Sequence, residues 1–269
     1  MILRHRILLA LLAFALSACA GFATDRPTIA PEPTATAAPP TSTPVPILPA
    51  ASATPFPQPT PLPAVTPTAP ATPDPNLGVG DEIYSDKFDG ASGWFWTFAD
   101  DVVEFEARDG ELNVETKQGN SWRFVVRTDI TGGDQRLSVI ARAVACPGAD
   151  EYGVMFRAQF DETQIIHSYI YKFNCAGAAR VERLDDVNTT VLKDWQTYPA
   201  IHTGAPAENT MTVWMAKHTF HFFANDQFLF TLTNSSLDEG FYGFYVQSHS
   251  NGGGALGFDD FVVNEVVLP

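Results

Sequence analysis

Four apolar segments of this sequence carry aromatic, cationic and amide side chains at alternate positions. Successive side chains of an extended strand point to opposite faces, so the bulkier apolar face of each segment is predicted to lie in a core. This alternation predicts that five residues point outward: Arg157, Lys172, Trp214, Tyr245 and Gln247. Their rings and hydrogen-bonding heads would together suit a saccharide. The alternative is that they lie on a convex face or under loops, because a register slip of one residue reverses every assignment.

The N-terminus carries a different chemistry. A basic start is followed by the apolar run 7–16, which is too short for an ordinary spanning helix and is typical of a secretory signal peptide. The end of the run, Leu16-Ser17-Ala18-Cys19, resembles the lipobox of bacterial lipoproteins. That resemblance implies cleavage of residues 1–18 and a lipid on the Cys19 thiol. An ordinary signal peptide, cut after Ala18 or Ala20, is the alternative.

The lipid would anchor an exported protein to the cell membrane, with its domain on the side away from the cytoplasm. Because Ala20 rather than an aspartate follows Cys19, the pattern resembles export to the outer membrane in a cell that has two.

Residues 19–79 are predicted to form a disordered linker behind Cys19. Between positions 26 and 75 the sequence holds 17 of its 21 prolines, interleaved with threonine and alanine. Proline removes backbone donors and fixes φ, so this segment cannot continue a helix or pair into a sheet. An extended polyproline II chain of this length reaches on the order of 150 Å. We interpret it as a spacer; a docking ligand for another protein is the alternative.

Residues 80–269 are predicted to form one all-β domain. Short runs rich in Val, Ile, Phe, Tyr and Trp alternate with turn residues, and about a dozen strands of this kind imply a two-sheet sandwich. Turns are predicted at Asp109-Gly110, Lys217-His218 and Asn225-Asp226. The segments 135–145, 151–160 and 163–173 are predicted to form a three-strand meander.

The two remaining cysteines, Cys146 and Cys175, follow the first and third strands of that meander. These two strand ends would lie on the same side of a sheet, where loops can approach each other. In an exported protein the simplest interpretation is one disulfide, and two unpaired thiols are the alternative.

Several stretches resemble the concanavalin A-like lectin/glucanase jelly roll, with laminin G-like and 3-keto-disaccharide hydrolase domains as similar branches. They are "SDKFDGASGW", "YGVMFRAQ", "ENTMTVWMAKHTFHFFANDQFLFTLTNSSLDEGFYGFYVQS" and "FDDFVV". The resemblance implies two curved antiparallel sheets with the first and last strands near each other. It also implies a face or rim that binds glycans or protein partners, and several branches bind calcium.

Catalysis is not indicated by the sequence. Glucanases of this fold carry E-x-D-x-x-E on one strand, and no such cluster occurs here. Glu104 and Glu106 share a strand face, and we interpret them as a solvated face rather than a catalytic pair. The N-S-G tripeptide of the keto-disaccharide branch is replaced by Asp150-Glu151-Tyr152. A glycoside-acting hydrolase therefore stays an alternative.

Calcium is the only candidate cofactor. Carboxylates near the first strand and in the last strand, which the resemblance places close together, could bind a hard cation. They are Asp86, Asp89, Asp259 and Asp260. The alternative is that Asp89 and Asp259 cap turns.

The charge of the predicted domain limits the kinds of partner that it can bind. Residues 80–269 carry 28 acidic and 13 Lys or Arg side chains, which repels nucleic acid and anionic headgroups. The sequence therefore predicts an envelope lipoprotein whose sandwich binds carbohydrate or another envelope ligand without catalysis. A hydrolase and a protein-binding or adhesion module are the alternatives.

Overall fold

The computed structural model describes residues 71–90, 93–94 and 100–268. The predicted signal peptide, Cys19 and nearly all of the predicted linker lie outside these residues. Among the described residues, no helix is long and apolar enough to cross a membrane.

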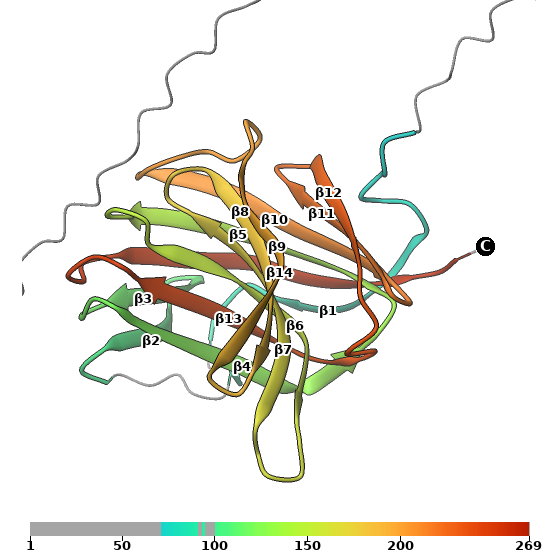
Figure 1. The fold of residues 1–269 in the computed structure, drawn as a ribbon, viewed down its shortest axis with the longest axis horizontal. Coiled ribbons are helices and arrows are strands. Elements are labelled where there is room, and N and C mark those ends of the chain that lie inside the picture. The colour runs from blue at the N-terminus through green and yellow to red at the C-terminus, as the bar shows by residue number, and fades with distance from the viewer. Residues whose placement is uncertain (1–70, 91–92, 95–99, 269) are drawn as a thin grey trace, which may run out of the picture. The chain divides into compact units, whose positions relative to one another are not determined.

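The described residues form fourteen strands (Figure 1). Their bounds are β1 (Val79–Asp86), β2 (Val103–Arg108), β3 (Glu111–Thr116), β4 (Ser121–Gly132), β5 (Gln135–Ala145), β6 (Glu151–Phe160), β7 (Ile166–Asn174), β8 (Ala178–Asp185), β9 (Asn188–Thr197), β10 (Ala207–Ala216), β11 (Thr219–Ala224), β12 (Gln227–Thr233), β13 (Gly240–Ser248) and β14 (Ala255–Val266).

These strands make two antiparallel sheets. The eight-stranded sheet has the order β12-β11-β10-β5-β14-β3-β2, with β1 paired to β14, and the six-stranded sheet has the order β4-β13-β6-β7-β8-β9. The all-β jelly-roll sandwich predicted from the sequence is confirmed. The pairing of β1 with β14, which sets Asp86 opposite Phe261, confirms that the first and last strands are neighbours.

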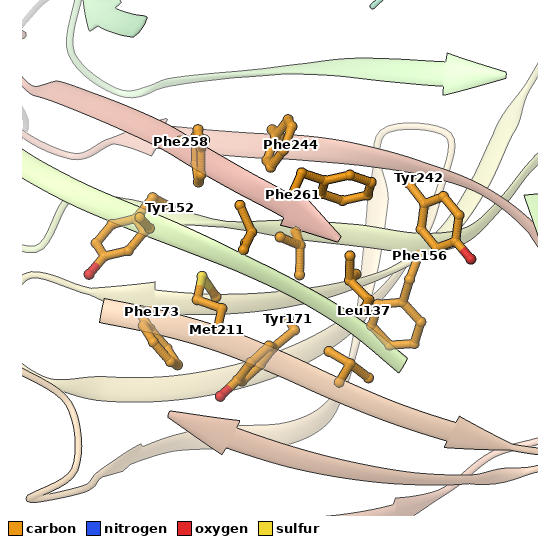
Figure 2. Close-up of a cluster of buried hydrophobic side chains, with 14 of the residues drawn as sticks. Leu137, Tyr152, Phe156, Tyr171, Phe173, Met211, Tyr242, Phe244, Phe258 and Phe261 are labelled. Carbon is orange, nitrogen blue, oxygen red and sulfur yellow. The ribbon is translucent and has the colours of Figure 1, made fainter. Parts of the chain in front are cut away.

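Aromatic side chains from both sheets fill the space between them (Figure 2). Phe244 of the six-stranded sheet stacks on Phe258 of the eight-stranded sheet, with ring centroids 4.4 Å apart. Tyr171 packs on Phe222 at 4.9 Å, and its hydroxyl donates to the carbonyl of Phe223. The buried Tyr171 hydroxyl costs little free energy because it makes this hydrogen bond. The alternation that places these rings inside places every second residue of the same strands outside.

The predicted hairpin turns are confirmed. Arg108 pairs with Glu111 across Asp109-Gly110, and both turn residues have positive φ, at 57° and 79°. The β10–β11 and β11–β12 hairpins also close through two-residue turns, at Lys217-His218 and Asn225-Asp226. Asp and Asn tolerate this left-handed conformation better than most residues, which is why such pairs mark turns in a sequence.

The predicted three-strand meander is wrong. Strand β5 pairs with β10 and β14 in the eight-stranded sheet, whereas β6 and β7 pair in the other sheet. Three consecutive apolar strands look alike in sequence whether or not the chain changes sheets between them. The predicted disulfide is nevertheless present: Cys146 and Cys175 are bonded, with Cα atoms 5.8 Å apart. It ties the β5–β6 connection, which crosses between the sheets, to the end of β7.

Removal of this disulfide is expected to destabilise the domain. Replacing both Cys146 and Cys175 by serine frees a loop with a sequence separation of 29 residues. Chain-entropy arguments give about 3–4 kcal/mol for a loop of that length. Urea unfolding followed by tryptophan fluorescence measures the loss. A change below about 1 kcal/mol would contradict a structural role for the bond.

Candidate functional site

A pocket of about 250 Å³ opens on the face of the six-stranded sheet that points away from the core. All six strands of this sheet contribute to it, β7 through Lys172. The lining residues are Trp122, Glu151, Lys172, Arg180, Glu182, Leu184, Val187, Thr189, Tyr245, Gln247 and His249.

Strand alternation brings the lining residues to this face. In β7, Tyr171 and Phe173 enter the core, so Lys172 between them points outward. In β13, Phe244 and Val246 are in the core, and Tyr245 points outward. The interstrand register then sets these outward residues side by side. One row runs from Tyr245 through Gly153 and Lys172 to Arg180, each residue opposite the next.

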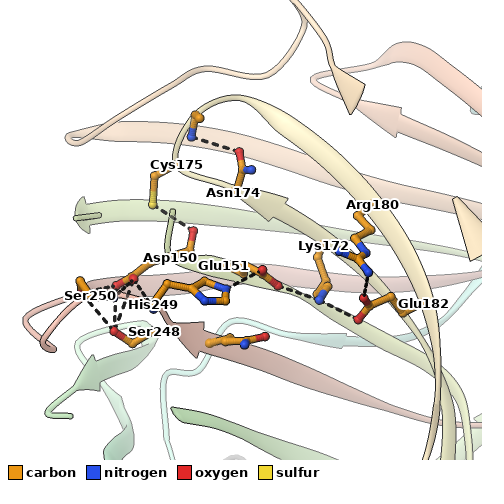
Figure 3. A network of polar contacts seen from close by, with 12 residues as sticks. Asp150, Glu151, Lys172, Asn174, Cys175, Arg180, Glu182, Ser248, His249 and Ser250 are labelled. Atoms are coloured by element: carbon orange, nitrogen blue, oxygen red, sulfur yellow. Dashed lines mark hydrogen bonds and ion pairs between the residues drawn. The ribbon is translucent and has the colours of Figure 1, made fainter. Parts of the chain in front are cut away.

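Lys172 is the centre of the pocket floor. Its side chain is 3% exposed, and its Nζ lies 2.6 Å from Oε2 of Glu151 and 2.7 Å from Oε2 of Glu182 (Figure 3). Both glutamates are also buried, at 8% and 5% side-chain exposure. A buried ammonium is costly unless it is paired, and here two carboxylates on the strands flanking β7 pair with it.

Two further basic side chains complete the network. His249 Nε2 lies 2.7 Å from Oε1 of Glu151, and Arg180 Nη2 lies 2.6 Å from Oε1 of Glu182. Each glutamate therefore has one oxygen on Lys172 and the other on an outer basic side chain. His249 and Arg180 are the more exposed members, with side-chain exposures of 38% and 21%. The series His249–Glu151–Lys172–Glu182–Arg180, called the charge row below, presents its two ends to solvent.

Asp150 fixes the position of His249. Its buried carboxylate accepts hydrogen bonds from the His249 and Ser250 backbone amides, at 2.7 and 3.1 Å, and from the Ser248 and Ser250 hydroxyls. These bonds hold the β13–β14 loop against the start of β6 (Figure 3). The Cys175 amide donates to the carbonyl of the same aspartate, at 3.2 Å. The disulfide and the histidine therefore share one anchoring residue.

Aromatic rings stand beside the charge row. Trp122 stacks on Tyr245 with centroids 6.0 Å apart and planes 21° apart, and on Phe124 with a 15° angle. Lys172 Nζ lies 5.2 Å from the centre of the Tyr245 ring and 5.7 Å from that of Trp195, within cation–π range. Trp122 is partly exposed and therefore offers flat apolar surface next to fixed polar groups, with the 4% exposed Tyr245 ring packed beside it.

The Tyr245 hydroxyl is kept protonated. Burial, together with the charges of Glu151 and Glu182, raises its pKa far above the usual range. It donates to Oε1 of Gln247 at 2.9 Å, which orients the amide at the edge of the pocket.

Gly153 makes room for this arrangement. It lies between Tyr245 and Lys172 in the row, and a Cβ added there would come within 2.1 Å of the Tyr171 carbonyl. A residue with a side chain would have to displace backbone, so glycine at this position keeps the lysine and the tyrosine ring at close range.

Three of the five predicted outward residues meet in the pocket: Lys172, Tyr245 and Gln247. Arg157 does not, and the prediction that it points outward is wrong. It is 1% exposed, lies over the Phe220 ring and donates to the carbonyls of Leu237 and Gly133. The cause is a register shift between Phe156 and Gln159, where Arg157 has a φ of 49°. A bulge of this kind turns one side chain to the opposite face.

Trp214 points away from the core as predicted, but from the other sheet. It is 5% exposed, stacks on His221 and donates from Nε1 to the carbonyl of Leu77, in the segment that leads into β1. It therefore covers the eight-stranded sheet and does not join Lys172, Tyr245 and Gln247.

Three of the four predicted calcium ligands contact donor groups of the protein. Asp86 accepts from the Tyr84 hydroxyl and Trp94 Nε1, both at 2.9 Å, whereas Asp259 binds Arg142. The other two calcium candidates are Asp89, exposed beside the β2–β3 turn, and Asp260, 3.9 Å from Lys87. Within residues 71–90, 93–94 and 100–268, no three His, Cys, Asp or Glu side chains are grouped to hold a metal ion.

Glu104 and Glu106 lie on β2, the edge strand of the eight-stranded sheet. They pair with Lys117 at 2.8 Å and Arg108 at 2.9 Å, respectively. Both glutamates line a shallow groove on that sheet and are well separated in the fold from the charge row.

Sequence reasoning missed most of the charge row and one ring: Trp122, Glu151, Arg180, Glu182 and His249. Strands β4, β8 and β9 were not predicted, so Trp122, Arg180 and Glu182 had no face assigned. A usable signal existed in "AARVERLDDVNTTVLKDWQT", where Asp185-Asp186 separates a run with alternating Arg180-Val181-Glu182 from a run rich in threonine, valine and tryptophan. Glu151 and His249 sit at strand ends, where alternation is least informative.

The comparisons with known proteins identify the fold. No family model matches the sequence, and no curated protein matches it significantly. Among solved structures, a Bacillus subtilis protein of unknown function with a galectin-like fold is similar: 12% identity, 71% of this chain and 99% of that one, TM-score 0.57.

Two other solved structures are also similar. A GlcNAcα1-4Gal-releasing endo-β-galactosidase from Clostridium perfringens has 11% identity over 74% of this chain and 66% of that one, with a TM-score of 0.54. The carbohydrate-binding module CBM66 from Bacillus subtilis has 12% identity over 64% and 96%, with a TM-score of 0.47. The fold is that of the concanavalin A-like sandwiches, as the sequence predicted.

Replacement of Lys172 by methionine is expected to destabilise the domain strongly. The change leaves Glu151 and Glu182 buried without their shared cation, a situation that costs about 3–5 kcal/mol. Urea unfolding monitors the loss. The matched control is Lys87→Met, which removes a 70% exposed lysine and is expected to change stability by less than about 0.5 kcal/mol. Equal effects of the two variants would contradict the central role of Lys172.

Proposed function

We propose that this domain binds a saccharide in the pocket on the six-stranded sheet, without catalysis. The observation that carries the proposal is the joining, in one pocket, of stacked aromatic rings and a fixed row of charged hydrogen-bonding groups. Trp122 and Tyr245 supply the rings, and the charge row with Gln247 supplies the donors and acceptors.

This combination matches the chemistry of a sugar. One face of a pyranose ring is apolar and packs on an aromatic plane, while its hydroxyls need partners that both donate and accept. Hydrogen bonds to charged groups contribute about 1.5–3 kcal/mol each, more than neutral ones. Because the side chains of Glu151, Lys172 and Glu182 are already held by one another, little rotamer freedom remains to be lost on binding.

The fold comparison agrees with a carbohydrate-related role. One of the similar structures is named as an endo-β-galactosidase, although its low identity relates it to this chain by fold only. Partners of a different kind fit less well. The net charge of −15 disfavours nucleic acid, and the pocket is small and largely polar, unlike the core of most protein–protein interfaces.

A glycoside hydrolase is the second candidate, because one distance favours it. Glu151 and Glu182 each place an oxygen within 2.7 Å of Lys172 Nζ, so those oxygens are separated by no more than twice that length. Retaining glycosidases hold their carboxyl groups about 5–5.5 Å apart. A general acid must carry a proton, however, and both glutamates lie against Lys172 Nζ, with their other oxygens on His249 and Arg180. We therefore favour binding.

Replacement of Trp122 by alanine is expected to weaken saccharide binding by about 10- to 30-fold, because tryptophans central to a binding site commonly contribute this much. The measurement is a glycan-array screen of the full-length protein, followed by calorimetric titration of the glycan that binds. Phe160→Ala is the matched control, since Phe160 is 38% exposed, packs on Phe241 and lies outside the pocket. No glycan binding by the unmodified protein would overturn the proposed function. Release of reducing ends that stops in Glu151→Gln would favour the hydrolase.

We also propose that the domain is exported and lipid-anchored through Cys19, which the lipobox-like sequence supports. Cys19→Ser is expected to shift the protein from the membrane fraction to the soluble fraction of the extracytoplasmic space. Metabolic labelling with a fatty acid, followed by fractionation, measures this. Unchanged membrane association and unchanged labelling in the variant would exclude the anchor.

A further inference from the structure

The two ends of the pocket differ in chemistry. Arg180, Glu182 and Leu184 alternate along β8 and therefore share its outward face, over a distance of about 13 Å. The Arg180 end belongs to the charge row. The other end, near the β8–β9 turn, is lined by Leu184, Val187 and Thr189, which present methyl groups.

Val187 is an unusual residue for its position. Asp185 pairs with Asn188, so Asp186 and Val187 are the two residues of a tight turn, and Asp186 has a φ of 60°. Such turns favour Gly, Asn and Asp, and a β-branched apolar residue gains nothing there. Val187 is nevertheless 66% exposed at the rim of the pocket. A residue type that is unfavourable for its local backbone conformation, with no stabilising contact in return, is often found at a functional site.

The polar end is balanced in charge. Lys172 and Arg180 are matched by Glu151 and Glu182, and His249 faces Glu151. An anionic sugar would meet no cation without a carboxylate already beside it, and the net charge of −15 would repel it. A neutral sugar avoids both penalties, because its hydroxyls can bond to the charged groups without upsetting the balance.

We propose, on the basis of the saccharide binding proposed above, that the ligand is a neutral sugar carrying a methyl-terminated substituent. The hydroxyls face the charge row, and the methyl group packs against Leu184 and Val187. A 6-deoxy sugar and an N-acetylated sugar both provide such a methyl group. Val187 is then the residue that selects between a sugar with the methyl group and one without it.

The test is a glycan array in which each neutral sugar is printed beside its 6-deoxy, N-acetylated and uronic-acid counterparts. Burying one methyl group contributes about a three- to fivefold gain in affinity, so the 6-deoxy or the N-acetylated member should exceed its parent by at least that factor. The uronic acids should bind more weakly than their parents. The array also shows which of the two methyl sources is used.

The paired variants are Val187→Asn and Val191→Asn. Asparagine suits the turn, so the first is expected to fold normally and to lose the preference for the methylated member while it keeps affinity for the parent sugar. Val191 is also exposed on β9, at 46%, but lies outside the pocket lining, so its variant should keep the preference.

The outcomes separate the two proposals. If no sugar binds, the proposed function fails and this inference fails with it. If sugars bind but methylated and parent members are equal, if uronic acids bind best, or if Val187→Asn keeps the full preference, the proposed function stands and this inference is overturned.

Discussion

The ion triad of Lys172 with Glu151 and Glu182 is the constraint on which the pocket face of the six-stranded sheet depends. Burying a lysine to 3% exposure is costly unless its carboxylate partners remain beside it, and those partners lie on β6 and β8. A one-residue slip of β7 would move Lys172 into the aromatic core and bring Tyr171 or Phe173 outward. The triad and the aromatic core therefore select the same register, one by charge and the other by burial.

The same triad is coupled to the junction between the sheets. The disulfide fixes the crossing segment before β6, the carbonyl of Asp150 accepts from the Cys175 amide, and its carboxylate holds the loop that carries His249. Glu151, the next residue, then meets the histidine ring. The two adjacent acidic residues therefore have different roles. Asp150 binds the backbone of the β13–β14 loop, and Glu151 lines the pocket. Because Asp150 and Glu151 are adjacent, the disulfide and the pocket are both connected to the same short segment.

The parts of this structure that follow local rules could be predicted from the sequence, and the parts that depend on strand partners could not. The turns at Asp109-Gly110 and Asn225-Asp226 follow from backbone conformations that few residues adopt. Alternation placed Lys172 and Tyr245 correctly. It failed at Arg157, because a bulge is set by the pairing of β6 with β7, and it could not tell that Trp214 lies on the other sheet. The disulfide was predicted correctly although the predicted meander was wrong. Cysteines near strand ends of an exported protein tend to pair, whichever sheets those strands belong to.

The balance of charges also bears on the choice between binding and catalysis. An enzyme accelerates a reaction only through interactions that strengthen as charge develops in the transition state. In this pocket each glutamate oxygen already has a lysine, arginine or histidine nitrogen beside it, and the Tyr245 hydroxyl already donates to Gln247. Groups satisfied in this way have little left to gain during bond cleavage, but they give a rigid surface that a sugar can bind without reorganising it. Fixed, compensated charges beside stacked rings therefore support the proposed saccharide binding rather than the alternative of cleavage.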